Sequence, residues 1–266
     1  MNQPLAYIHP QAKLASNVVI EPFSTIYKDV EIGEGTWIGP NVIIMEGARI
    51  GKNCKIYPGA VISAAPQDLK YYGEPTLTYI GNNTIIREYV TVNRGTSAQG
   101  YTKVGENCLI MTAVHIAHDC ILGNHVILVN GVGLAGHIEI DDWAIIGGMC
   151  PVHQYTKIGA HALIAGGSLV RKDVPPFVKA GRTPLAYIGV NSIGLRRRGF
   201  FPEKIVEIQA IYRVLYQRNR NISQALEIIE TEIDATAERD EIIQFIQNSS
   251  RGIMRGYIKR GSSNEL

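Results

Sequence analysis

The sequence predicts a mainly β protein, a parallel β-helix of hexapeptide repeats followed by a small α-helical C-terminal domain. Isoleucine outnumbers leucine by 37 to 15 among the 266 residues, and its β-branched side chain favours extended backbone. An aliphatic residue recurs at every sixth position from Ile8 onward. Beyond Pro202, apolar residues are instead spaced three and four apart, which is typical of amphipathic helices.

The six-residue period defines the predicted β-helix. Between residues 8 and 170, Ile, Leu or Val occupies 25 of the 28 positions in this series, and the exceptions are Asp68, Glu74 and Ala98. An α-helix repeats every 3.6 residues, so the period excludes a helix and fits the hexapeptide class of β-helix. Three hexads would close one triangular coil of about 18 residues, with the aliphatic side chains stacked inside.

The small residue four positions after an aliphatic residue should also point into the prism. All four cysteines occupy such positions, so packing explains them without a metal or redox role. They form no CxxC pair, which favours reduced thiols in a cytoplasmic protein. The four are Cys54, Cys108, Cys120 and Cys150.

Two segments, at about residues 63–79 and 93–103, interrupt the aliphatic series without changing its register, so we predict loops that leave the coil and return. The adjacent prolines Pro175 and Pro176 should end the repeat, because proline cannot continue a paired ladder. We therefore predict a β-helix over residues 1–188 and a helical domain over 189–266. Within that domain, helices should begin near Pro202 and cover residues 222–234 and 239–248.

Composition excludes several classes of protein. The net charge of +2 gives no electrostatic reason to expect a nucleic-acid partner. No apolar run reaches the ~18 residues that a membrane span needs. The start of the chain lacks a basic residue followed by an apolar stretch, so we expect no signal peptide.

The candidate site follows from the coil length. Residues 18 apart should stack in neighbouring coils, which brings four of the seven histidines within about three coils of one another. His118, Gly136 and Gln154 share one column, and the other members lie beside it. The full group comprises His115, His118, Asp119, Gly136, His137, His153 and Gln154.

From the residues alone, three interpretations of this group stay open. A histidine general base could remove a proton from a hydroxyl near neutral pH. Three histidines could hold zinc, as in the β-helical carbonic anhydrases, although their ligand spacing is not reproduced here. The β-helix could also be a scaffold whose histidines are solvated turn residues. Near Asn191, the basic run of residues 196–198 is either a phosphate site or a solvated patch.

Several strings resemble a known family, the acyl-carrier-protein-dependent UDP-N-acetylglucosamine O-acyltransferases that begin lipid A synthesis. The strings run through nearly the whole chain, so they are more specific than the hexads alone. They include PQDLKY, GEP, RGT, HIAHDC, LAGH, IIGG, VHQ, DVPP and RRGF, at residues 66–71, 73–75, 94–96, 115–120, 134–137, 145–148, 152–154, 173–176 and 197–200.

The resemblance implies a homotrimer of left-handed β-helices with active sites between neighbouring subunits. The donor would be a (R)-3-hydroxyacyl chain on the phosphopantetheine of acyl carrier protein, with no further cofactor and no metal. The acceptor would be UDP-N-acetylglucosamine, or a 3-amino sugar as in some relatives. The alternatives are the glucosamine N-acyltransferase of the same pathway, whose extra N-terminal domain has no room before Ile8, and the zinc enzyme.

The resemblance also implies residue roles. His118 matches the general base, Asp119 could orient its ring, and the Gly136 N–H is the candidate oxyanion donor. Gly166 lies where the family sets acyl length, and its small size favours a medium-to-long chain. Ile193 stands where well-known members carry glutamate. The implied substrate contacts are Gln67, Asp68, Lys70, His115, His137, His153, Gln154, Asn191, Arg197 and Arg198.

Overall fold

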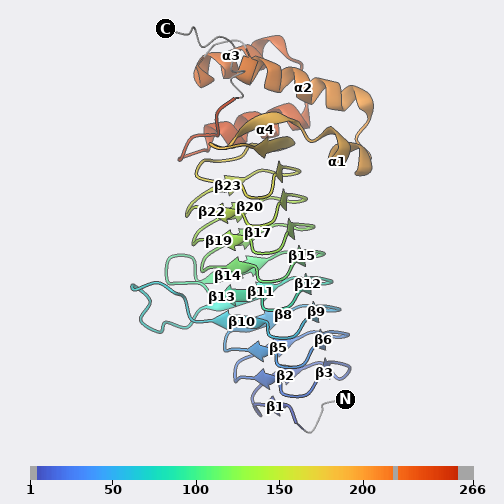
Figure 1. The fold of residues 1–266 in the computed structure, drawn as a ribbon, viewed down its shortest axis with the longest axis vertical. Coiled ribbons are helices and arrows are strands. Elements are labelled where there is room, and N and C mark those ends of the chain that lie inside the picture. The colour runs from blue at the N-terminus through green and yellow to red at the C-terminus, as the bar shows by residue number, and fades with distance from the viewer. Residues whose placement is uncertain (1–4, 218–220, 257–266) are drawn as a thin grey trace, which may run out of the picture.

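The structure, a computed structural model, describes residues 5–217 and 221–256. Residues 1–4, which bear on the signal-peptide expectation, and residues 257–266 of the predicted helical domain lie outside the described residues. Short strands stack into a tall column, with helices gathered at its C-terminal end (Figure 1). The stack is a left-handed parallel β-helix, which confirms the predicted fold class.

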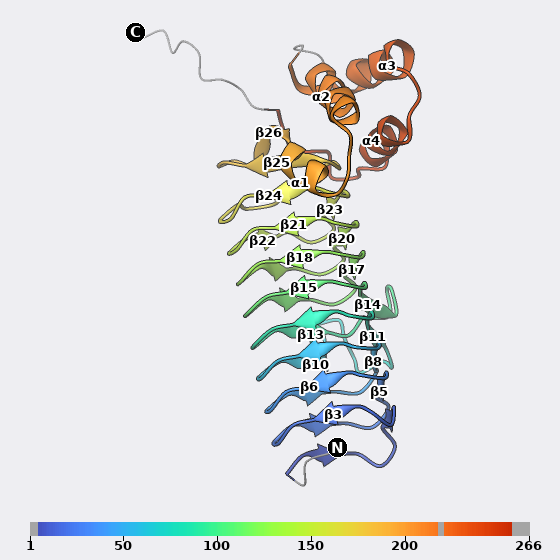
Figure 2. The ribbon, with the colours of Figure 1, turned by 90° about the vertical axis from the view of Figure 1, so that its right-hand side faces the viewer.

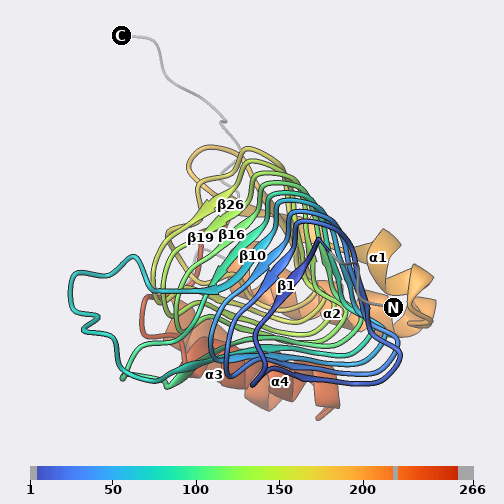
Figure 3. The ribbon, with the colours of Figure 1, turned by 90° about the horizontal axis from the view of Figure 1, so that it is seen from below.

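Three sheets form the faces of the prism in the described residues, and up to β24 every third strand of the chain joins the same face in parallel (Figure 3). The first sheet contains β1 (Tyr7–Ile8), β4 (Thr25–Ile26), β7 (Ile43–Ile44), β10 (Val61–Ala64), β13 (Thr91–Asn93), β16 (His115–Ile116), β19 (Gly133–Leu134) and β22 (Pro151–Val152). The second contains β2 (Lys13–Leu14), β5 (Glu31–Ile32), β8 (Ala48–Ile50), β11 (Leu77–Ile80), β14 (Tyr101–Val104), β17 (Ile121–Leu122), β20 (Glu139–Ile140) and β23 (Lys157–Ile158). The third contains β3 (Val19–Ile20), β6 (Trp37–Ile38), β9 (Lys55–Ile56), β12 (Ile85–Ile86), β15 (Leu109–Ile110), β18 (Ile127–Leu128), β21 (Ile145–Ile146), β24 (Leu163–Ile164), β25 (Val178–Gly181) and β26 (Ala186–Val190).

The register confirms the 18-residue coil. Tyr7 of β1 pairs with Thr25 of β4, and the same spacing recurs along the stack. The spacing grows to 30 between Val61 and Thr91, and to 24 between Leu77 and Tyr101. The two interruptions therefore add whole hexads. They span residues 65–76 and 94–100, here called the first and second excursions, and they project from one corner of the prism (Figure 3).

Stacked aliphatic side chains fill the interior. The aliphatic members of the every-sixth-residue series are buried from Ile20 to Val170, and Ile8 and Leu14 at the open end are half-buried. The small residues four positions on are buried too, and the polar ones among them bond to the next coil. The Ser24 hydroxyl donates to the Gly39 carbonyl (2.7 Å), as Thr36 and Thr84 do to their own next-coil carbonyls.

The four cysteines follow the same rule, which confirms them as small core residues. Each thiol is free and buried, and each lies within sulfur hydrogen-bonding distance of a carbonyl in the following coil, such as Cys120 Sγ to Ala135 O at 3.1 Å. Burial raises the pKa of Cys108 to about 11 and that of Cys120 to about 12. These thiols are therefore protonated near neutral pH and poor nucleophiles.

The end of the repeat differs from the prediction. The third sheet continues past Pro175 and Pro176, because β24 pairs in parallel with β25, with Leu163 opposite Lys179. The prolines lie in the connection between these strands, where no ladder N–H is needed. β26 then returns antiparallel to β25. The predicted division at residue 188 falls inside β26 and stays a prediction.

Within the described part of the chain, four helices follow the last strand (Figure 2). They are α1 (Ser192–Arg197), α2 (Pro202–Gln217), α3 (Ile222–Glu232) and α4 (Ala237–Gln247). α2 begins at the predicted proline, and α3 starts behind an Asn221 capping box. Helix α1 was not predicted from the sequence, because six residues are too few to show the helical period of 3.6 residues. No helix among residues 5–217 and 221–256 combines the length and apolarity needed to cross a bilayer.

The buried thiols lead to a direct prediction. A disulfide reagent at mildly alkaline pH should leave the native protein unmodified, because raised pKa values and burial suppress the thiolate. Unfolding in denaturant should expose all four thiols to rapid reaction. Absorbance of the released thiolate measures both rates, and fast labelling of the native protein would contradict the packing described.

Candidate active site

A tight turn after β16 places His118 and Asp119 side by side. Adjacent residues on a strand point to opposite faces, so their sequence positions alone leave a contact undecided. Asp119 adopts a left-handed conformation with φ of 60°, which aspartate tolerates better than most residues. The turn brings His118 Nδ1 within 2.7 Å of Asp119 Oδ2, a contact that the sequence left open.

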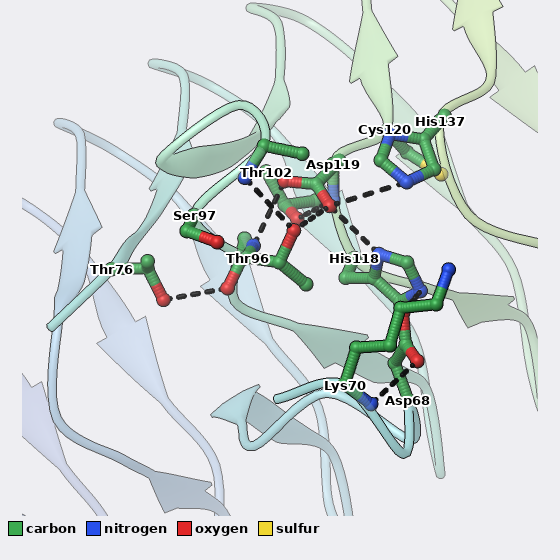
Figure 4. A network of polar contacts seen from close by, with 12 residues as sticks. Asp68, Lys70, Thr76, Thr96, Ser97, Thr102, His118, Asp119, Cys120 and His137 are labelled. Carbon is green, nitrogen blue, oxygen red and sulfur yellow. Dashed lines mark hydrogen bonds and ion pairs between the residues drawn. The ribbon is translucent and has the colours of Figure 1, made fainter. Parts of the chain in front are cut away.

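The Asp119 carboxylate sits in a buried cluster of donors (Figure 4). Thr96 of the second excursion donates its N–H to Oδ1 (2.8 Å) and its hydroxyl to Oδ2 (2.7 Å). Burial acts to raise the Asp119 pKa, but the hydrogen bonds from His118 and Thr96 outweigh it and lower the pKa below its ordinary value. Asp119 is therefore ionised and fixed in orientation at neutral pH.

The ionised Asp119 determines which nitrogen of His118 carries the proton. An anionic carboxylate oxygen accepts, so Nδ1 of His118 must be the protonated donor. Its Nε2 is then free to accept a proton. That atom faces the first excursion, with Asp68 Oδ2 at 3.8 Å (Figure 4). The arrangement can remove a proton from a group that enters beside Asp68.

Gly136 lies under the imidazole, as the predicted column requires. A Cβ built on Gly136 would stand 2.5 Å from Cε1 and 2.8 Å from Nε2 of His118, so only glycine leaves room for the ring. The neighbouring N–H of His137 donates to the His118 carbonyl (3.1 Å), which holds the two coils in register.

His137 and His115 surround the dyad. His137 stacks on Tyr155 with ring centroids 4.5 Å apart, and its Nε2 lies 3.6 Å from Asp119 Oδ2. His115 shares a hydrogen bond between Nδ1 and the Thr91 hydroxyl (2.7 Å). Burial lowers the pKa of both histidines, so both favour the neutral form. The first excursion adds Asp68, whose Oδ1 accepts from the Lys70 N–H (3.0 Å).

The remaining predicted residues do not bond to His118. Gln67 is exposed on the first excursion, and His153 and Gln154 are exposed in the turn after β22. Gly166 is exposed beyond β24, near the Gly148 backbone. Among the described residues, no hydrogen bond or ion pair joins these, or Asn191, Arg197 and Arg198, to His118.

His161, a turn residue outside the predicted site, holds Asn191 and Arg198 at the two ends of α1. The Asn191 amide donates to the His161 carbonyl (3.0 Å), and Arg198 Nη1 donates to His161 Nδ1 (3.2 Å). The Arg198 guanidinium also lies over the Trp143 ring at 5.3 Å. Burial and the adjacent Arg198 lower the pKa of His161 to about 4, which keeps this acceptor neutral. Arg197 and Ile193 are exposed on α1.

Two residues in the cluster were missed as site residues, Thr96 and Thr102. Thr102 accepts the Asp119 N–H through its hydroxyl (2.8 Å) and so supports the turn. Thr96 lay within one of the strings that carry the family resemblance, but its sequence position gave no sign that it reaches Asp119. Only the path of the second excursion brings it there.

His118, Asp119 and His137 could bring metal-ligand atoms within 4.8 Å of one another. Two ligands of one tetrahedral zinc ion would stand about 3.3 Å apart, given bonds of roughly 2.0–2.1 Å. The 2.7 Å between His118 Nδ1 and Asp119 Oδ2 is instead a hydrogen-bond distance, and Thr96 already donates to both Asp119 oxygens. The observed geometry fits a general base better than a metal site.

Family models and known proteins match this chain over most of its length. The family model described as Udp N-acetylglucosamine O-acyltransferase, domain 2, matches residues 173–254, and the bacterial transferase hexapeptide model matches residues 29–64 and 101–136. The acyl-[acyl-carrier-protein]–UDP-N-acetylglucosamine O-acyltransferases of Thiobacillus denitrificans and a Janthinobacterium species are 42% and 44% identical over 95% of this chain and 98% of each relative. Crystal structures of UDP-N-acetylglucosamine acyltransferases superimpose as well. The Bacteroides fragilis protein has a TM-score of 0.95 at 50% identity, covering 96% of this chain and 100% of its own. The Arabidopsis protein has a TM-score of 0.81 at 31% identity, covering 97% and 100%.

Gly136→Ala should displace the His118 ring, because its new Cβ would overlap the imidazole. Gly133→Ala is the matched control, since a Cβ on Gly133 meets nothing within 4 Å. Imidazole signals in two-dimensional NMR should move at His118 in the first variant and stay in place in the second. Unchanged His118 signals in Gly136→Ala would refute the close stacking.

His161 should make the fold sensitive to acid. Its pKa falls from 6.5 to about 4 on folding, so the unfolded chain binds more protons between these values. Stability from this group is present above about pH 6.5 and is lost as the pH falls toward about 4. Urea unfolding across that range should show a weaker acid dependence in His161→Gln than in the wild type, whereas His9→Gln near the N-terminus should change little. An equal acid dependence in wild type and His161→Gln would count against the assignment.

Proposed function

The chain belongs to the UDP-N-acetylglucosamine O-acyltransferase family, and from this membership we propose that it transfers a (R)-3-hydroxyacyl chain from acyl carrier protein to the glucosamine 3-position of UDP-N-acetylglucosamine. This reaction begins lipid A synthesis. The observation that carries the proposal is the His118–Asp119 dyad, whose free Nε2 faces the first excursion. It supplies the base that a hydroxyl acceptor needs.

The proposed reaction is a direct transfer. The acceptor hydroxyl attacks the thioester carbonyl while Nε2 of His118 takes its proton. The new C–O bond forms, the C–S bond breaks, and the proton passes to the departing pantetheine sulfur. Asp119 holds the ring in the correct tautomer and stabilises the imidazolium, since it stays anionic. The buried cysteines are unsuited to a covalent acyl intermediate, which is consistent with attack by the sugar itself.

The Gly136 N–H is the proposed oxyanion donor. Among the described residues it donates no hydrogen bond, and it lies in the coil next to His118. A donor fixed in advance beside the developing negative charge lowers the barrier without reorganisation. The close approach of Gly136 to the His118 ring supports placing the reacting carbonyl beside both groups.

The proposal assigns the remaining contacts by position. Asp68 and Lys70 would hold the sugar, because they lie on the excursion that faces Nε2. Further cleft contacts would be Gln67, His115, His137, His153 and Gln154. Gly166 would leave room for a medium-to-long acyl chain, since it is exposed and lacks a side chain. The donor's phosphopantetheine would be the only prosthetic group.

A homotrimer is part of the proposal. Asn191, Arg197 and Arg198 would contact the nucleotide or pantetheine, yet they lie on or beside α1 and no hydrogen bond or ion pair among the described residues joins them to the His118 cluster. A site shared between neighbouring subunits would let residues from different levels of the stack meet on one ligand. We further propose a cytoplasmic location, where the four free thiols would stay reduced.

His118→Ala should keep the fold and lose turnover by about 10²–10⁴-fold, the usual contribution of a general base. His9→Ala, a change of the same kind near the N-terminus, should retain activity. The assay follows UDP-N-acetylglucosamine with a panel of 3-hydroxyacyl carrier proteins and detects products by mass. Near-normal turnover in His118→Ala would overturn the role of this base.

The same panel tests the rest of the proposal. An ester product from UDP-N-acetylglucosamine that hydroxylamine cleaves would identify O-acylation. Turnover only of the 3-amino analogue of this sugar, giving an amide that resists hydroxylamine, would identify a 3-amino acceptor. Reaction of short chains alone would contradict the role given to Gly166. Activity that rises with added zinc and disappears with a chelator would favour the zinc enzyme over the His118 general base.

A further inference from the structure

The second excursion reaches the dyad through one residue, Thr96. Its N–H donates to Asp119 Oδ1 and its hydroxyl donates to Oδ2, so each carboxylate oxygen receives one bond from the same residue (Figure 4). Both residues are buried, with 8% of Thr96 and 3% of Asp119 exposed. Two bonds to two oxygens fix the plane of a carboxylate, whereas one bond lets it rotate.

The Thr96 hydroxyl is itself oriented. Its oxygen accepts the Ala98 N–H (3.2 Å), which directs its single proton toward Asp119. The surrounding loop is tied down as well: the Thr76 hydroxyl donates to the Gly95 carbonyl (2.6 Å), and the Ser97 N–H donates to Glu74 Oε1 (3.2 Å). These bonds come from the end of the first excursion, so the two loops hold Thr96 together.

We propose that Thr96 is a positioning residue of acyl transfer, which clamps both oxygens of Asp119 and through them sets the orientation of the His118 ring. The role rests on the proposed function, because it acts on the proposed base. Asp119 lies between Thr96 and the His118 ring, so Thr96 can act without touching the substrate.

The other charged groups around Asp119 cannot replace this clamp. His118 Nδ1 contacts Oδ2 alone, and His137 Nε2 lies 3.6 Å from the same oxygen, too far for a hydrogen bond. Glu74 adds a second negative charge near Asp119, so it offers Asp119 no hydrogen-bond donor. Its own carboxylate accepts from the backbone N–H groups of Tyr72 and Ser97. Among the described residues, the backbone N–H of Thr96 is therefore the hydrogen-bond donor on which Oδ1 depends.

Thr96→Val removes the hydroxyl at nearly constant volume, and Thr96→Ser restores it. We expect kcat to fall on the order of 10- to 100-fold in the valine variant, with KM for UDP-N-acetylglucosamine changed by less than about threefold. The serine variant should recover most of the rate. Thr36→Val is the matched control, because it deletes another buried hydroxyl far along the stack and should leave kcat and the pH profile unchanged.

A double-mutant cycle tests whether Thr96 acts through Asp119. In an Asp119→Asn background, Thr96→Val should reduce kcat by less than about twofold, because the group it positions is already altered. The acid limb of the pH–rate profile should also move to higher pH in Thr96→Val, since removal of a donor lets the Asp119 pKa rise. Equal losses in both backgrounds, or a valine variant with wild-type kcat, would overturn the proposal.

A measurement without substrate separates this inference from the proposed function. Carbon-13 NMR of the Asp119 carboxyl should show a higher pKa in Thr96→Val than in the wild type and in Thr96→Ser. If wild-type protein acylates no sugar in the panel, the proposed function fails while this titration still decides the clamp. An unchanged Asp119 titration would refute the clamp even in an active enzyme.

Discussion

The structure depends on the parallel hydrogen-bond ladder between successive coils. The His115 N–H donates to the Val132 carbonyl (2.9 Å), and equivalent bonds join each coil to the next along the stack. Because these bonds fix the register, residue n lies beside residue n+18 wherever no loop intervenes. A linear repeat is thereby converted into columns of stacked side chains, some inside the prism and others along its corners.

The corner columns carry the polar chemistry because the interior is filled. Corner residues adopt the left-handed conformation, which suits asparagine, aspartate and histidine at modest cost. One column stacks His125 on Trp143 (3.8 Å) and continues through His161, where it holds α1. The neighbouring column contains Asp119 and His137. The same backbone geometry therefore builds a ladder of stacked rings at one corner and the His118–Asp119 pair at another.

The excursions supply what a regular stack cannot. Regular coils place each side chain at a fixed height, so they cannot surround one group with donors from several directions. The two loops add whole hexads, which leave the ladder in register while Asp68 and Thr96 approach the dyad from outside. The Thr76 hydroxyl donates to the Gly95 carbonyl and the Ser97 N–H donates to Glu74, so hydrogen bonds join the loop of the proposed substrate contacts to the loop of the proposed Asp119 clamp.

The sequence by itself determined the coil, its core and the column that contains His118 and Gly136, because a period in sequence becomes a translation in space. It also located the excursions and the helix at Pro202. Only the tertiary structure decided that His118 and Asp119 share one face, since a left-handed turn reverses the usual alternation. It alone decided that the third sheet passes the prolines, that Thr96 reaches Asp119, and that His161 holds Asn191 and Arg198. These contacts depend on loop paths and local dihedral angles, which no periodic pattern specifies.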